Sequence, residues 1–213
     1  MKRILISIFV LIFTNSIINS QNNEPKILVM GVPQYLFMNG IRIDVDYCYK
    51  NKSWIVFSPQ YYNYNSSLGN DAFGLSDEYE TLSGAGLYIS LKRMMSKYSS
   101  KGLYIAGGAG YNYFDVFTKN KRVWEEFEPG RYAPVYKDYT VSINKIGINA
   151  LLGTQFSIFN VVYFDLYIGF GMRYAFRKIP ENSFTFFNTS NSDYGYRGTL
   201  FVSGFRVGLP IGY

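Results

Sequence analysis

The stretch that decides the fold is VYFDLYIGFGMRYAFR, residues 162–177. Its apolar residues alternate with small, polar or charged residues along the whole stretch without a slip. A period of two is typical of a β-strand, because successive side chains of a strand point to opposite faces. The apolar face carries Val162, Phe164, Leu166, Ile168, Phe170, Met172, Tyr174 and Phe176. Residues 41–49 and 205–213 repeat the pattern, so several strands of the same kind are predicted.

The composition favours a single all-β domain. The chain of 213 residues contains 21 Tyr, 18 Phe and 20 Gly, and aromatic residues make up 19% of it. Such a chain is too aromatic to be disordered, and β-sheets favour aromatic residues. Beyond the first fifteen positions, no apolar run approaches the roughly 18 residues that a membrane-spanning helix needs.

The second face of the predicted strands suggests a membrane barrel rather than a soluble one. In a soluble sandwich that face meets water and is rich in Lys, Glu and Thr. Here it carries Gly, Tyr, Asn and isolated charges, which suit the narrow lumen of a small barrel. The apolar face is therefore expected to meet lipid, with Tyr and Phe near the strand ends forming an interfacial girdle.

We predict eight antiparallel strands that form an up-and-down transmembrane β-barrel. The predicted strands are residues 27–37, 41–49, 54–64, 82–92, 102–114, 140–155, 161–176 and 199–213. Residues 38–40 (Met-Asn-Gly) are expected to form a tight hairpin. Long connections are expected at 65–81, 115–139 and 177–198, with short turns between them. This asymmetry predicts periplasmic termini and long loops outside the cell.

The first 20 residues are typical of a secretory signal peptide. Met1-Lys2-Arg3 is basic, residues 4–13 are apolar except for Ser7, and residues 14–20 are mostly small or polar. The alternative is a membrane anchor, for which the apolar stretch is short. Removal of residues 1–20 leaves 19 basic and 15 acidic residues in the barrel domain, 21–213. A charge of +4 without a basic stripe does not indicate a nucleic-acid partner.

The end of the chain carries a resemblance to a known family. Alternate apolar residues lead to a terminal aromatic at Phe205, Val207, Leu209, Ile211 and Tyr213. With the eight strands, this resembles small outer-membrane barrels of the OmpX/OmpA-transmembrane type, in the Bacteroidetes version labelled PorT-family or outer membrane protein beta-barrel. The resemblance implies that these five residues are an insertion signal, and that the barrel-assembly machinery is a transient partner. Pro210 departs from the family's pattern, because it removes a donor from the last strand.

Eight charged residues are predicted to face the lumen and to neutralise one another. They are Arg42, Asp44, Asp46, Lys92, Lys145, Asp165, Arg173 and Arg206. Buried charges must be paired, so a mutual network is expected to serve as the core of a filled barrel. Asp44 and Asp46 lie on one face, and a proton or ion path is the alternative interpretation.

The sequence does not predict an enzyme, a cofactor or a metal site. It contains no His and one Cys, Cys48. Ser142 and Lys145 have the spacing S-x-x-K, but residues three apart on a strand point to opposite faces. Residues 107–110 (Gly-Gly-Ala-Gly) lack the Gly-Lys-Ser/Thr that completes a phosphate-binding loop, and they are better explained as space on the lumen wall.

The predicted outer loop at 115–139 holds the candidate partner-binding residues Trp124, Phe127, Tyr132 and Tyr136. Exposed aromatic residues flanked by charges resemble interface anchors, whereas the simpler interpretation is contact with lipopolysaccharide in the outer membrane. Three functions remain open at this point. The favoured one is a structural or interaction role, in adhesion or in a larger outer-membrane complex. The others are a narrow channel and a lipid-modifying enzyme, the last disfavoured by the lack of His.

Overall fold

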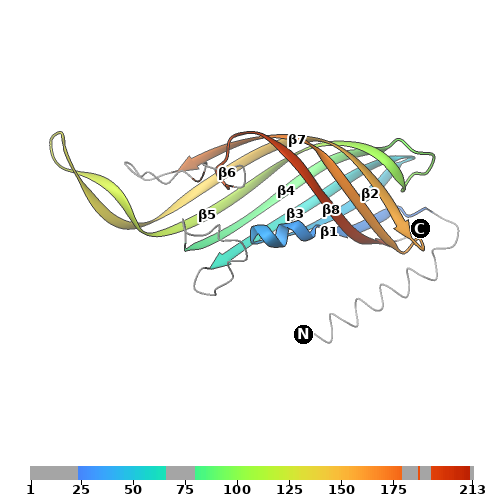
Figure 1. Ribbon diagram of the computed structural model, residues 1–213, viewed down its shortest axis with the longest axis horizontal. Helices are drawn as coiled ribbons and strands as arrows, with labels where there is room; N and C mark the ends of the chain where they lie inside the picture. Colours follow the sequence, from blue (N-terminus) through green and yellow to red (C-terminus); the bar gives the residue numbers. More distant parts are fainter. Residues whose placement is uncertain (1–23, 66–79, 179–186, 188–192, 212–213) are drawn as a thin grey trace, which may run out of the picture.

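Eight antiparallel strands form one closed barrel in chain order, as the sequence predicts (Figure 1). The computed structural model describes residues 24–65, 80–178, 187 and 193–211. The elements are β1 (Ile27–Gly31), η1 (Pro33–Met38), β2 (Gly40–Lys50), β3 (Ser53–Asn65), β4 (Thr81–Met94), β5 (Gly102–Glu128), β6 (Arg131–Ile158), β7 (Val162–Lys178) and β8 (Gly198–Ile211). Ile27 of β1 is paired with Ile211 of β8, and this pairing closes the ring. We call the end of the barrel that holds this pair the terminal end and the opposite end the hairpin end.

The outside of the barrel wall is apolar. Its exposed side chains include Ile43, Phe57, Ile89, Leu91, Ile105, Ile148, Leu152, Leu166, Ile168, Phe170, Met172, Phe201 and Phe205. An apolar belt around a closed ring of strands is the surface that a membrane-spanning barrel presents to lipid, and closure leaves no unpaired sheet edge around most of the ring. Among the described residues, no helix has the length and apolar character needed to cross a membrane.

The first strand is shorter than predicted. It ends at Gly31, and residues 33–38, of which 33–37 were predicted to belong to this strand, form the 3-10 helix η1. Pro33 starts the helix, where its missing N–H costs nothing, and Asn39 ends it in the left-handed conformation with φ of 53°. The prediction of a tight hairpin at 38–40 was therefore wrong, because η1 and Asn39 together connect β1 to β2.

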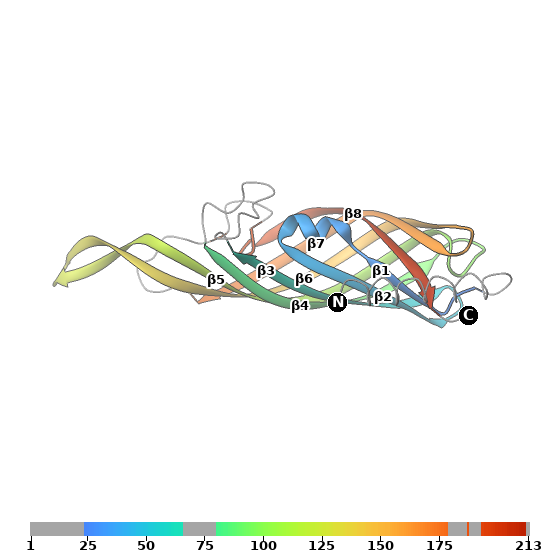
Figure 2. The same cartoon turned by 90° about the horizontal axis from the view of Figure 1, so that it is seen from below.

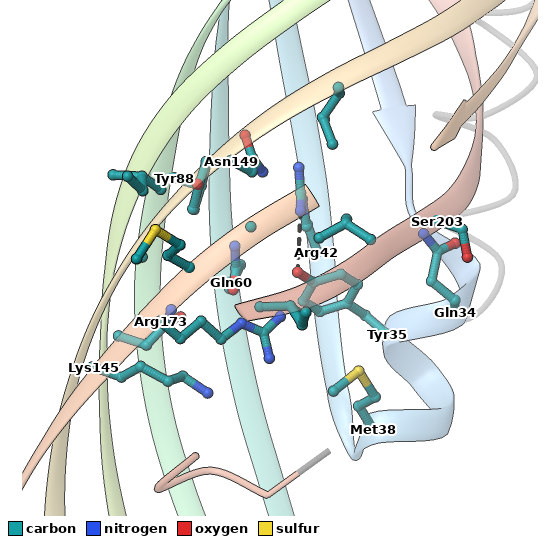
Figure 3. A pocket seen from close by; sticks show the side chains of 18 of the residues that line it. Gln34, Tyr35, Met38, Arg42, Gln60, Tyr88, Lys145, Asn149, Arg173 and Ser203 are labelled. Carbon is teal, nitrogen blue, oxygen red and sulfur yellow. Dashed lines mark hydrogen bonds between the residues drawn. The ribbon is translucent and has the colours of Figure 1, made fainter. Parts of the chain in front are cut away.

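The short first strand leaves part of the barrel wall to η1. β1 pairs with β8 only from Val207 to Ile211. Towards the hairpin end, β8 has no strand partner on that side among the described residues. There η1 packs beside β2 and β8, with Leu36 and Phe37 exposed outside and Tyr35 turned towards the lumen (Figures 2 and 3).

The connection predicted as a loop at 115–139 is a long β-hairpin. β5 pairs with β4 only as far as Phe117, and β6 pairs with β7 only from Ser142. Residues 118–141 therefore have no strand partner outside β5 and β6, and we call them the β5–β6 ribbon. Figures 1 and 2 show the ribbon extending far beyond the hairpin end. The loop prediction failed because the ribbon's charged residues conceal the strand alternation.

The lumen is filled at two levels. The terminal-end cluster consists of Leu28, Met30, Trp54, Met94, Tyr104, Tyr163 and Tyr167. The hairpin-end cluster consists of Tyr62, Tyr64, Leu82, Phe114, Val116, Val123, Tyr139, Val141, Ile143, Ala175, Phe187 and Tyr194. The glycines of the 107–110 stretch that face inwards make room for opposing side chains, since a Cβ on Gly110 would lie 2.0 Å from the Tyr88 ring.

Candidate functional site

A buried charge network crosses the lumen near the terminal end, and Arg206 is at its centre. Arg206 Nη2 donates to Asp165 Oδ2 at 2.5 Å, from the strand position directly opposite. Its Nη1 donates to Asp44 Oδ2 at 3.0 Å and to Asp46 Oδ1 at 3.2 Å. The three carboxylates are fully buried, so one guanidinium joins β2, β7 and β8 through the interior.

Lys92 reaches two of the same carboxylates from the other side of the barrel. Its Nζ donates to Asp46 at 3.1 Å and to Asp165 at 2.9 Å, and also to Gln155 Oε1. The ammonium lies 4.3 Å from the centre of the Tyr104 ring, while the Tyr104 hydroxyl donates to Asp165 at 2.5 Å. Lys92 therefore ties β4 to the strands that Arg206 joins.

Arg42 completes the network and balances its charge. Its Nε and Nη2 donate to the two oxygens of Asp44 at 2.6 Å and 3.0 Å, in a bidentate pair. Three cationic side chains thus face three carboxylates, so the network is neutral. With the apolar terminal-end cluster beside it, the network fills the lumen at this level, and neither Gln155 nor Tyr104 was singled out from the sequence.

Lys145 and Arg173 do not belong to this network, so the prediction of one network of eight residues was wrong for these two. Both side chains lie on inward-facing positions of β6 and β7, as predicted, but nearer the hairpin end. No ion pair joins either of them to a described carboxylate. The ammonium of Lys145 instead lies 4.7 Å from the ring centre of Phe114 and 5.7 Å from that of Tyr194.

A cavity of about 370 Å³ separates the charge network from the hairpin-end cluster (Figure 3). Arg42 and Tyr167 line its terminal side, and Tyr62 and Tyr194 its hairpin side. Its remaining polar lining is Gln34, Tyr35, Gln60, Tyr88, Ser90, Asn112, Lys145, Asn149, Arg173 and Ser203. Sequence reasoning missed this cavity, because alternation identifies the side chains that point inwards but not the space they leave.

The predicted partner-binding residues lie on the β5–β6 ribbon. Trp124 is paired with Pro134, Tyr132 with Glu126, and Tyr136 with Arg122, which places the three aromatic side chains on one face. Tyr132 and Tyr136 are 50% and 62% exposed, and Trp124 is half-buried beneath the Arg122 guanidinium at 4.5 Å. Phe127, also exposed, lies at an irregularity of the pairing near the tip of the ribbon.

Four of the five residues of the predicted insertion signal lie on β8, and the two residues with the S-x-x-K spacing lie on β6. Phe205, Val207, Leu209 and Ile211 share the outward face of β8, whereas Tyr213 lies outside the described residues. Pro210 is accommodated opposite Leu28. Ser142 faces outwards and donates to Asp115 at 2.7 Å, while Lys145 is buried inside, so the S-x-x-K residues do not meet.

No family model and no curated protein matches the chain. Among solved structures, the chain is similar to Acinetobacter baumannii CarO, with a TM-score of 0.41 and 10% sequence identity. The alignment covers 90% of this chain and 100% of that one. Structural similarity and sequence identity this low say nothing about function. The function is therefore inferred from the residues of this chain alone.

Proposed function

We propose that this chain is a non-enzymatic outer-membrane barrel whose β5–β6 ribbon binds a protein partner at the cell surface. The apolar belt and the closed ring of strands support a place in a membrane. In this proposal residues 1–20 direct export, the terminal end faces the periplasm, and lipopolysaccharide surrounds the hairpin end. The partner is a component of a larger outer-membrane complex, and the barrel-assembly machinery acts only during insertion.

The observation that carries the proposal is the aromatic face of the ribbon. Trp124, Tyr132 and Tyr136 lie side by side on a structure that makes no strand pairing with the barrel wall. Aromatic residues and Arg are enriched where proteins bind one another. A two-stranded ribbon also has two unpaired edges, which can accept a strand from a partner.

The charge of the ribbon favours a protein over the phosphates of lipopolysaccharide. Residues 118–141 contain five basic and four acidic side chains. Glu128 pairs with Arg131 at 2.9 Å, and Glu125 pairs with Lys137. A phosphate-binding surface needs unpaired cations, whereas a nearly neutral surface with aromatic anchors suits a protein interface.

The alternatives have less support. A channel would have to pass the network of Arg206, Lys92 and their three carboxylates, which crosses the lumen. An acyl-transfer enzyme needs a nucleophile beside a base, and Ser142 and Lys145 lie on opposite faces of β6.

The test removes the aromatic face and leaves the ribbon intact. The variant Trp124→Ser/Tyr132→Ser/Tyr136→Ser is compared with Glu125→Gln/Lys137→Gln, which changes the opposite face of the same ribbon. Each tagged protein is purified from native outer membranes in mild detergent, and bound proteins are quantified by mass spectrometry. We expect a stoichiometric partner with wild type and the control, and its loss with the aromatic variant.

Two results would contradict the proposal. One is a partner that the aromatic variant retains in full, which would place the interface elsewhere on the barrel. The other is recovery of wild type with lipopolysaccharide as its sole stoichiometric companion, which would make the ribbon a lipid-contacting element.

A further inference from the structure

We propose that the lumen cavity is a binding site for a small oxyanion, a carboxylate or phosphate group of a soluble solute, held between Lys145 and Arg173. The inference is independent of the proposed function of the ribbon. It rests on the charge of the cavity lining, the position of the two cations, the polar atoms around them and the size of the space.

The lining of the cavity has an excess of positive charge. Arg42, Lys145 and Arg173 line it, and no Asp or Glu is among its described lining residues. Arg42 is neutralised by Asp44, which leaves Lys145 and Arg173 without a described counterion. Lys145 is only 8% exposed. Arg173 is partly buried. Buried charges in proteins are paired or bind a counterion, so Lys145 with Arg173 beside it calls for an anion.

The two cations converge on one space. Arg173 is the strand partner of Gly147, and Lys145 is the strand partner of Ala175, so the two are diagonal neighbours on the inner face of β6 and β7. Figure 3 shows both long side chains directed towards the same part of the cavity. Like charges in such an arrangement repel each other, and an oxyanion between them converts the repulsion into two attractions. The planar guanidinium can bind two oxygens while the ammonium binds a third.

Neutral polar groups around the cations are also left without partners. Gln34 Oε1, Asn112 Oδ1 and Asn149 Oδ1 are buried and accept no hydrogen bond from the described residues. All three residues line the cavity. Asn112 and Asn149 each also carry an NH₂ group that can donate to an anion, whereas the NH₂ of Gln34 already donates to the Tyr167 hydroxyl. Buried polar atoms are rarely left unpaired in proteins, so these amides are an independent indication of a missing ligand.

The space suits a small solute. A cavity of about 370 Å³ lies at the lower end of the range of small-molecule sites, roughly 300–1,000 Å³. Gly147 lines the cavity, and a Cβ there would meet its nearest neighbours at ordinary contact distances, 3.5 Å and 3.6 Å. A larger side chain at Gly147 would therefore occupy the cavity without displacing the backbone.

The test is a titration of the folded, detergent-solubilised barrel with inorganic phosphate and with acetate, at constant ionic strength maintained with chloride. Binding is measured by calorimetry and by the rise in melting temperature that a ligand of the native state causes. Lys145→Met, Arg173→Met and Gly147→Leu are compared with Lys137→Met, the same change on the exposed ribbon part of β6. We expect wild type and Lys137→Met to bind at least one of the two anions. Each cavity variant should bind at least about ten-fold more weakly, the loss expected for one charged hydrogen bond.

A second readout separates the site from a merely structural role. Without phosphate or acetate, Lys145→Met should melt no lower than wild type, since it removes an unpaired buried charge, yet its anion-dependent shift should be lost. If Arg173→Met does not fold, Lys145→Met and Gly147→Leu provide the test. Absence of binding of both anions to wild type, equal affinity in the cavity variants, or binding only after lipopolysaccharide is added would each overturn the proposal.

Discussion

Asp165 and Arg206 face each other directly across the pairing of β7 and β8, with their charged atoms 2.5 Å apart in the buried lumen. This contact lies beside the β1–β8 closure, so the last strand is fixed on one side by the backbone ladder and from inside by an ion pair. Through Arg206 the same contact reaches Asp44 and Asp46 on β2, beyond β1. The charge network therefore spans the junction at which the first and last strands of the chain meet.

Removing either partner of this ion pair should destabilise the barrel strongly. Asp165→Leu or Arg206→Leu leaves a buried charge uncompensated, which costs about 3–5 kcal/mol in free energy of unfolding. The double variant leaves Asp44 and Asp46 facing Arg42 and Lys92, and should lose less than the sum of the single losses. Urea unfolding in lipid vesicles measures all three. The exposed pair Glu128 and Arg131 provides the control, since its removal should cost less than about 1 kcal/mol.

Two glycines of the lumen wall should respond differently to alanine. A Cβ at Gly110 would lie 2.0 Å from the Tyr88 ring, whose hydroxyl donates to the Gly108 carbonyl at 3.0 Å. Gly110→Ala must displace that ring and should cost about 1–3 kcal/mol. Gly147→Ala, with its nearest contact at 3.5 Å, should change the free energy of unfolding little. Equal melting temperatures of the two variants would contradict this packing.

The barrel should conduct no steady ionic current. The charge network and the terminal-end cluster fill the lumen at one level, and an eight-stranded barrel is just wide enough for such side chains. Planar-bilayer recordings of the purified protein should therefore lack discrete single-channel steps at moderate voltage. A sixteen-stranded porin inserted into the same bilayer serves as the positive control. Reproducible steps from this protein would establish an open path past Arg206.

The outward face of β8 should matter more for assembly than for the stability of the finished barrel. Phe205→Asn/Leu209→Asn is expected to reduce the folded fraction in cells, measured as heat-modifiable mobility on gels. The same protein refolded in detergent should reach the native mobility, because both side chains lie on the outer surface. Phe170→Asn on β7, where the side chain is 71% exposed, is the control. An equal assembly defect in that control would argue against a signal specific to β8.

Strand alternation made most of the barrel predictable. In β2 and β7 every second residue is apolar, and in both strands this face points outwards in the structure. The sequence could therefore assign Asp44, Asp46, Asp165 and Arg206 to the inside. It could not assign them to levels along the barrel, because level depends on the stagger of the strands. For that reason Lys145 and Arg173 were expected in a network from which they are absent.

The two errors in secondary structure have different physical causes. In the β5–β6 ribbon both faces are exposed over much of its length, so polar residues occur on each and the period of two is hidden. At η1, an apolar stretch with Pro33 was interpreted as strand, although proline is confined to edges and starts of strands. Here Leu36 and Phe37 meet the lipid side from a helical turn rather than from a strand.

The position of η1 gives the barrel wall one line of lower mechanical strength. Elsewhere around the ring, separating two neighbours means breaking a continuous series of backbone hydrogen bonds. Near the hairpin end, η1 is joined to β2 by a backbone bond at Val32, but no backbone hydrogen bond of the described residues joins η1 to β8. A side-chain hydrogen bond from Gln34 Nε2 to the Tyr167 hydroxyl on β7, 2.8 Å long, also holds η1 in place. Outward displacement of this short helix would connect the lumen cavity sideways to the surrounding bilayer. A compound dissolved in the membrane would then have a shorter route to the interior than one arriving from water at either end.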